Sequence, residues 1–211
     1  KIVDEIPHEA RLMVRGLDFG YSNDPTVIVD VYEYNGGYVI DQQFYKKGAH
    51  NNEIAILLNS LDQPSTLVIA DSAEPKSIDE IRRHGINIIP AIKGPGSVNR
   101  GIDFVQSQKI SLTKSSVETI KCYRNYMWKT DRLGKIINKP DHDYSDPMDA
   151  IRYALSSFIK RNEESIEDYN KAANQLVNRY QFDPHEENPL PQTKEEYEDM
   201  TESYLSQMLI N

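Results

Sequence analysis

The chain has 211 residues and a net charge of −9, with 38% hydrophobic and 27% charged residues. This length allows one domain with a sizeable core and an appendage, and no apolar run approaches the roughly 20 residues that a membrane helix needs. The only cysteine, Cys122, excludes an intramolecular disulfide and a cysteine-based zinc site. Because the first residues also lack the apolar region of a signal peptide, we expect a reducing, cytoplasmic setting and no membrane contact.

The acidic charge is concentrated at one end of the chain. Residues 161–211 contain 4 Lys or Arg and 12 Asp or Glu, so they account for −8 of the net −9. The overall acidity therefore argues only weakly against a nucleic-acid partner. We divide the chain into an N-terminal linker over 1–10, a globular domain over 11–160 and an acidic tail over 161–211. Prolines at 184, 189 and 191 are typical of a linker, and a short amphipathic helix is expected over 195–209.

The first half of the chain predicts strands before helices. Strands are expected over 11–18, 26–34 and 38–45, with a hairpin turn at Asn35-Gly36-Gly37 between the second and the third. The spacing of apolar residues then predicts a helix over 52–61. A short apolar strand at 66–71, a helix over 77–84 ending before Gly85, and a strand at 87–92 follow.

The second half is predicted to be mainly helical. Helices are expected over 98–108 and 116–126, with a short strand at 109–112 between them. Residues 127–140 are expected to form a hairpin that turns at Leu133-Gly134. The last helix is expected over 146–160, with Asp146 at the N-cap and Pro147 at the first helical position. This order predicts an α/β fold: a mixed central sheet, made of an antiparallel three-strand meander plus parallel strands, flanked by helices.

Three aspartates stand where such a sheet would bring them together. Asp18 ends the first strand, Asp71 ends the strand after the first helix, and Asp149 lies in the first turn of the last helix. If the strands ending in Asp18 and Asp71 are parallel neighbours, both carboxylates emerge at one edge of the sheet, where open α/β sheets bind ligands. Clustered aspartates cannot all ionise comfortably without a cation, and their oxygens suit Mg²⁺ or Mn²⁺.

Each aspartate also has a purely structural interpretation. Asp18 and Asp71 can cap the turns that follow them, and Asp149 fits a capping position that favours the dipole of its helix. For any one of them alone we favour the structural interpretation. Their occurrence at the ends of three separate elements favours a metal site.

The segments around these aspartates resemble the three acidic motifs of the nuclease domain in phage large terminase subunits. In the order and at spacing similar to that family's, they read Gly16-Leu17-Asp18-Phe19-Gly20-Tyr21-Ser22-Asn23-Asp24-Pro25, Ala70-Asp71-Ser72-Ala73-Glu74-Pro75-Lys76-Ser77 and Asp146-Pro147-Met148-Asp149-Ala150-Ile151-Arg152-Tyr153. The loop at 93–98, between the second and third motifs, also fits. The resemblance covers roughly residues 10–160 and implies a ribonuclease H-like fold.

The resemblance implies a site and a reaction. The family's catalytic, metal-binding acids fall on Asp18, Asp71 and Asp149, with Asp146 as an auxiliary ligand and Glu74 as a further auxiliary candidate. It implies two Mg²⁺ or Mn²⁺ ions and hydrolysis of double-stranded DNA with little sequence preference, as when concatemeric viral DNA is cut during packaging. In that arrangement Asp18 bridges the two ions, and Asp71 and Asp149 each complete one site.

The resemblance also implies partners. The family's full subunit carries an N-terminal packaging ATPase domain, but this sequence has no Gly-x-x-x-x-Gly-Lys-Ser/Thr loop, so we expect it to be the nuclease half. By analogy, further partners are the procapsid portal, on which the acidic tail is a candidate docking segment, and the small terminase subunit. The expected setting is the cytoplasm of the host cell.

Basic residues that could hold DNA fall in three places. Lys76 follows the second motif, while Lys93 and Arg100 belong to a glycine-containing loop and the helix after it. The predicted hairpin has one acid, Asp131, and four bases: Lys129, Arg132, Lys135 and Lys139. For every one of these the alternative is an ordinary surface side chain. Because contacts to phosphates supply most of the non-specific affinity for DNA, we favour the hairpin as the main DNA-binding element.

Three other functions stand as alternatives. An actin-like ATPase matches Gly16–Gly20, but it needs a glycine-rich phosphate loop after its later aspartate, and 71–75 contains no glycine. A related ribonuclease H-like nuclease such as a junction resolvase would be distinguished by cleavage of branched DNA. A non-catalytic DNA-binding module would keep the fold but bind no metal, which calorimetry with Mn²⁺ would reveal.

Overall fold

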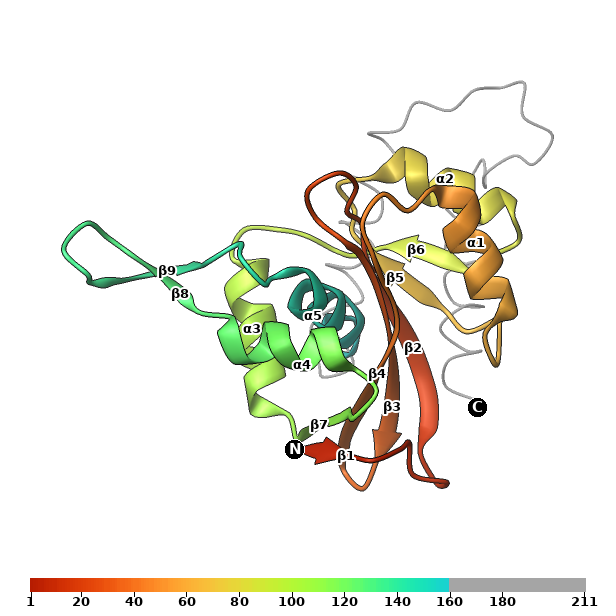
Figure 1. The fold of residues 1–211 in the computed structure, drawn as a ribbon, viewed down its shortest axis with the longest axis horizontal. Coiled ribbons are helices and arrows are strands. Elements are labelled where there is room, and N and C mark those ends of the chain that lie inside the picture. The colour runs from red at the N-terminus through yellow and green to blue at the C-terminus, as the bar shows by residue number, and fades with distance from the viewer. Residues whose placement is uncertain (160–211) are drawn as a thin grey trace, which may run out of the picture. The chain divides into compact units, whose positions relative to one another are not determined.

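The computed structural model describes residues 1–159. Helices cover both faces of a sheet, and a separate hairpin extends away from the rest of this fold (Figure 1). The tail predicted over 161–211 lies outside the described residues. No helix of the described part is long and apolar enough to cross a membrane. The strands are β1 (Ile2–Val3), β2 (Arg11–Asp18), β3 (Thr26–Tyr34), β4 (Gly37–Lys46), β5 (Val68–Ala70), β6 (Ile88–Pro90), β7 (Ile110–Thr113), β8 (Trp128–Thr130) and β9 (Ile136–Pro140). The helices are α1 (Asn51–Ser60), α2 (Pro75–Arg83), α3 (Ser97–Ser107), α4 (Val117–Asn125) and α5 (Asp146–Ile159).

The main sheet has the order β1-β7-β4-β3-β2-β5-β6, and β8 pairs with β9 in a sheet of their own. Strands β2, β3 and β4 form the predicted antiparallel meander. Its hairpin turn has positive φ at Asn35 and Gly36, 48° and 67°, a combination that asparagine and glycine tolerate best. Strand β5 lies parallel to β2, and β7 lies parallel to β4. The predicted mixed α/β fold class is therefore confirmed.

Two local expectations need correction. Residues 1–10, expected to be a linker, contribute β1, which pairs with β7 through Ile2↔Leu112 and Val3↔Thr113. A two-residue strand has no periodicity to detect, because its pairing rests on backbone bonds. Asp146, expected at the N-cap of the last helix, is already helical: the carbonyl of Ser145 accepts the first bond, from the amide of Asp149 at 2.7 Å. Ser145 is therefore the N-cap residue.

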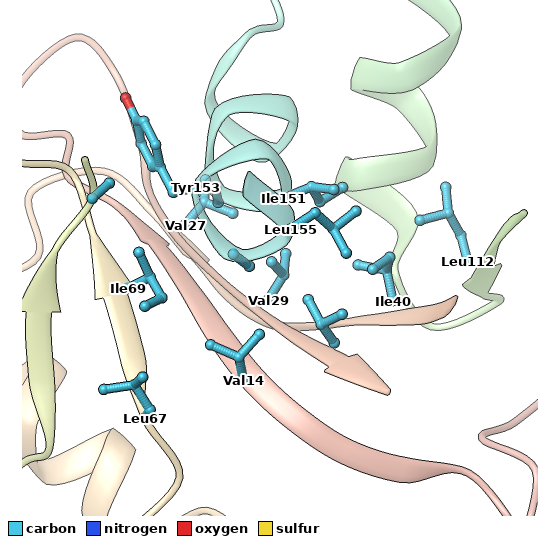
Figure 2. Packing of buried hydrophobic residues seen from close by; sticks show 14 residues of the cluster. Val14, Val27, Val29, Ile40, Leu67, Ile69, Leu112, Ile151, Tyr153 and Leu155 are labelled. Carbon is cyan, nitrogen blue, oxygen red and sulfur yellow. The ribbon is translucent and has the colours of Figure 1, made fainter. Parts of the chain in front are cut away.

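Two apolar cores lie on opposite faces of the sheet. One packs α1 and α2 against Leu17, Ile28 and part of β5 and β6. The other packs α5 against the opposite face of the meander, and Figure 2 shows Ile151 and Leu155 above Val29 and Ile40. This division follows from the strand period of two, which sends alternate residues of β2 and β3 to opposite faces.

A buried ion pair joins β2 to β3. Arg15 and Asp30 face each other in the strand register, and Arg15 Nε donates to Asp30 Oδ1 at 2.8 Å. The guanidinium also donates to the carbonyls of Asp62 and Gln63, so its donors are well satisfied. Burial raises the pKa of Asp30 to about 6, although the charge of Arg15 opposes this rise. The pair is therefore a structural element remote from solvent.

Gly16 lets α5 approach the sheet. A Cβ atom at this position would lie 2.1 Å from the carbonyl oxygen of Ala150, which is much too close for any side chain. The first turn of α5 therefore rests directly on the backbone of β2. Since Asp149 precedes Ala150 and Asp18 lies two residues after Gly16, this close approach brings the start of α5 to the carboxyl end of β2.

Candidate metal centre

Asp18 is the buried centre of an acidic cluster. It is the last residue of β2, is 7% exposed, and no hydrogen bond or ion pair engages its carboxylate within residues 1–159. Burial is the main cause that raises its pKa well above the ordinary range, followed by the charges of Asp149, Asp71 and Asp146; Lys93 opposes the rise. A bound cation would stabilise a buried carboxylate that three neighbouring acids repel.

Asp71 lies beside Asp18 because β2 and β5 are parallel neighbours. The register pairs Leu17 with Ala70, and the amide of Asp71 donates to the carbonyl of Leu17 at 3.0 Å. Its Oδ1 accepts the amide of Ala73 at 2.8 Å and also the ammonium of Lys93. The capping interpretation is thus correct for this residue, yet the same carboxyl group stands at the sheet edge expected for a ligand.

Asp149 reaches the cluster from α5. Its Oδ1 accepts two bonds from Arg152, from Nε at 3.1 Å and from Nη2 at 2.6 Å. Both the Asp149 and the Asp71 carboxyl groups therefore use Oδ1 alone in these bonds, and in the described part of the chain no hydrogen bond engages either Oδ2. One oxygen of each flanking acid remains available for another cation.

Asp146 also belongs to the cluster, where its charge acts on Asp18 less strongly than those of Asp149 and Asp71. It is among the groups that raise the pKa of Asp18. Its own pKa is raised to about 6, by burial first and then by the charges of Asp24 and Asp149. Asp24, in the loop after β2, did not stand out in the sequence, although it lies within the first acidic motif.

Several predicted residues lie elsewhere. Glu74 is exposed at the start of α2, and within residues 1–159 its carboxylate makes no hydrogen bond or ion pair with the acidic cluster. Lys76, in α2, and Arg100, in α3, are exposed, and within residues 1–159 neither makes a hydrogen bond or ion pair with the acidic cluster. Of the predicted DNA-binding residues outside the hairpin, only Lys93 touches the cluster. The structure thus gathers Asp18, Asp71, Asp149, Asp146 and Lys93.

The predicted hairpin exists and carries its basic residues on the surface. Arg132 and Lys135 are exposed around the turn, and Lys129 lies 3.8 Å from the carboxylate of Asp141. Leu133, at the turn, is 93% exposed. Figure 1 shows β8 and β9 reaching outward beyond α3 and α4, and most residues of this hairpin are exposed to solvent.

Arg152 and Tyr153 were not recognised from the sequence. Arg152 binds Asp149, and the ring of Tyr153 lies 4.7 Å from its guanidinium carbon and 5.1 Å from the Lys93 ammonium. Figure 2 shows the Tyr153 hydroxyl directed away from the aliphatic core. Burial, then the charge of Asp18, raises the pKa of this phenol far above the ordinary range, so it stays protonated. The i, i+3 spacing of Asp149 and Arg152 was the sequence signal that could have revealed the ion pair between them.

The donor set suits a hard divalent cation, but the side chains are paired with bases. Within residues 1–159 no three His, Cys, Asp or Glu side chains are arranged to hold a metal ion as they stand. In this arrangement Lys93 holds Asp71, and Arg152 holds Asp149. The available ligands are all carboxylate oxygens, which Mg²⁺ and Mn²⁺ prefer, and Asp18 forms no hydrogen bond or ion pair in the described part of the chain. The chemistry of the donor set therefore fits a divalent cation.

Comparisons with known proteins agree with this arrangement. The family model described as "Terminase RNAseH like domain" matches residues 18–157. The large terminase subunit of Bacillus phage SPP1 is 32% identical over 160 residues, which cover 72% of this chain and 37% of that protein. The PBSX phage terminase large subunit of Bacillus subtilis (strain 168) is 28% identical over 153 residues, 68% of this chain and 34% of that protein. The chain thus spans about a third of the length of the curated relatives it matches.

Solved structures show the same fold. The crystal structure of the SPP1 large terminase nuclease domain with bound Mn has a TM-score of 0.65 and 27% identity, covering 75% of this chain and 96% of that one. The nuclease domain of the P22 large terminase has a TM-score of 0.54 and 14% identity, covering 79% of this chain and 91% of that one. At that identity the P22 domain supports the ribonuclease H-like fold alone.

Proposed function

This chain belongs to the family of terminase RNase H-like domains, and from that premise we propose that it is a divalent-metal-dependent endonuclease that cleaves double-stranded DNA. The observation that carries the proposal is the meeting of Asp18, Asp71 and Asp149 at the carboxyl ends of β2 and β5 and the start of α5. The SPP1 nuclease domain, described with bound Mn, is a further support. Packaging ATPase, portal and small-subunit partners belong to the proposal only by analogy with whole large subunits.

The four acids take different roles in this proposal. Asp18 is the central ligand, because it is buried and no base within residues 1–159 forms an ion pair with it. Asp71 and Asp149 are the flanking ligands, each with one oxygen left available, and Asp146 is auxiliary. We propose that these residues hold two Mg²⁺ or Mn²⁺ ions. Divalent cations supply phosphodiester hydrolysis with an activated water and with charge that stabilises the departing oxygen.

Metal should stabilise the protein. The metal-free native state keeps mutually repelling carboxylates together, whereas the unfolded chain separates them, so a divalent ion that binds only the native state raises the melting temperature. We expect millimolar Mn²⁺ to raise the Tm of wild type by several degrees, as about 1 kcal/mol of binding free energy would do. Differential scanning calorimetry with Mn²⁺, Ca²⁺ and chelator measures this shift. An Asp18→Asn variant should lose most of it, and an unchanged wild-type Tm would argue strongly against a metal centre.

The basic hairpin should contribute to DNA affinity. Replacing Arg132 and Lys135 with alanine should weaken binding to all sequences alike, and the slope of log affinity against log salt should fall by about one unit for each phosphate that the protein no longer neutralises. Fluorescence anisotropy with duplex DNA at several salt concentrations, in Ca²⁺ to prevent cleavage, measures both. The double variant Lys109→Ala, Lys114→Ala removes the same charge on either side of β7 and should leave the slope unaltered. If the hairpin variant keeps the wild-type slope, the main DNA-binding surface lies elsewhere.

A further inference from the structure

The two acids that flank Asp18 already have cations of their own. The ammonium of Lys93 binds Asp71, and the guanidinium of Arg152 binds Asp149. Both cations also lie over the ring of Tyr153, at 5.1 Å and 4.7 Å from its centroid. Lys93, Tyr153 and Arg152 therefore form a cation–aromatic–cation bridge along the acidic cluster. In the metal-free protein this bridge compensates part of the repulsion that surrounds Asp18.

The two cations differ in their freedom to move. Arg152 is buried and packs against Gly101 of α3, where an added Cβ would lie 2.7 Å from the Arg152 Cγ. Its bond to Asp149 is made within one helix, so α3 and α5 together hold it in place. Lys93 has a side chain that is 38% exposed and belongs to a loop containing Gly94 and Gly96, the latter with φ of 72°. Of these two cations, Lys93 is therefore the one that can move by rotation of its own side chain.

We propose that Lys93 is the internal counter-ion of Asp71, a positioning residue that holds this carboxylate in the metal-free protein and gives way when a divalent cation binds. The proposal rests on the proposed metal-dependent function. An ammonium and a divalent cation repel each other at the same carboxyl group, so a metal ion that binds the remaining oxygen of Asp71 weakens the hold of Lys93 on Oδ1. The displaced ammonium stays beside the cluster, where the phosphate of bound DNA is the anion that can replace Asp71 as its partner.

Metal affinity tests the direction of this effect. Isothermal titration calorimetry of the whole 211-residue protein with Mn²⁺ at pH 8, where protons compete least for the ligands, compares wild type with Lys93→Met. We expect the variant to bind Mn²⁺ about thirtyfold more tightly, the effect of removing one unit charge about 4 Å from a divalent ion at the dielectric constant of water. The metal-free variant should also melt at a lower temperature, because Asp71 has lost its cation.

Two further variants make the result specific. Lys93→Gln removes the charge but keeps a polar side chain, and it should also bind Mn²⁺ more tightly. Lys46→Met breaks another half-exposed lysine–carboxylate pair, with Glu53, and should leave Mn²⁺ affinity unchanged. Equal or weaker Mn²⁺ binding by both folded Lys93 variants, with normal binding by wild type, would overturn the counter-ion role and leave the nuclease proposal standing. Absence of Mn²⁺ binding by wild type would overturn both.

Discussion

Asp18→Asn should reduce DNA cleavage at least about a hundredfold, more than the loss usual for residues that merely support a metal ligand. The variant keeps the volume of the side chain but removes the charge that would hold a cation at the centre of the cluster. Stability should change in the opposite direction. Because the native carboxylate is buried and repelled by Asp71, Asp146 and Asp149, the metal-free variant should melt no lower than wild type.

A loss of cleavage without a loss of stability would give Asp18 a functional role and not a structural one. Conversion of supercoiled plasmid measures activity, and calorimetry in chelator measures stability. Asp103→Asn, the same chemical change at an exposed position in α3, should affect neither. A folded Asp18→Asn protein that cuts DNA at the wild-type rate in Mn²⁺ is incompatible with the proposed site. A large loss of stability would mean that Asp18 is a structural residue.

Asp30→Asn should lower the free energy of unfolding by about 3–5 kcal/mol. The substitution leaves the guanidinium of Arg15 charged, fully buried and without a carboxylate. The carbonyls of Asp62 and Gln63 still accept two of its bonds, so the effect should fall toward the lower end of this range. Chemical denaturation at neutral pH, in chelator, measures it independently of any metal.

The same two strands offer a matched control. Arg11 and Glu33 are also opposite each other in the β2–β3 register, but both side chains are 53% exposed. Glu33→Gln should therefore cost about 1 kcal/mol or less. Equal effects of the two substitutions would show that burial does not determine the strength of these pairs. Replacing Arg15 and Asp30 together by Met and Leu should recover much of the loss, because the orphan charge disappears.

Local signals explain why most of the fold was predictable. The alternation in β2 and β3 and the turn at Asn35-Gly36 set the meander, whose strands begin and end at or within a residue of the predicted bounds. The position of Gly85, with φ of 81°, ended α2 as expected for a residue that tolerates the left-handed region. These features depend on neighbours in the sequence, so patterns within a few residues reveal them.

Features that depend on distant contacts were not predictable. Strand β1 gains its place only by pairing with β7, more than a hundred residues later. Lys93 is 22 residues from Asp71, and nothing local indicates that its loop returns to the end of β5. The order of the acidic motifs pointed to Asp18, Asp71 and Asp149, whereas the bases that pair with the flanking acids emerged only from the tertiary structure.

The proposed function is tested most directly by incubating the wild-type protein with supercoiled plasmid in Mg²⁺, in Mn²⁺ and in excess chelator. We expect nicked and linear DNA with either metal, intact plasmid in chelator, and recovery of cleavage when metal is restored. The Asp18→Asn protein, purified in parallel, should leave the plasmid intact in all conditions, which excludes a contaminating nuclease. Cleavage that persists in chelator, or folded wild-type protein that leaves plasmid intact in both metals, would contradict the account.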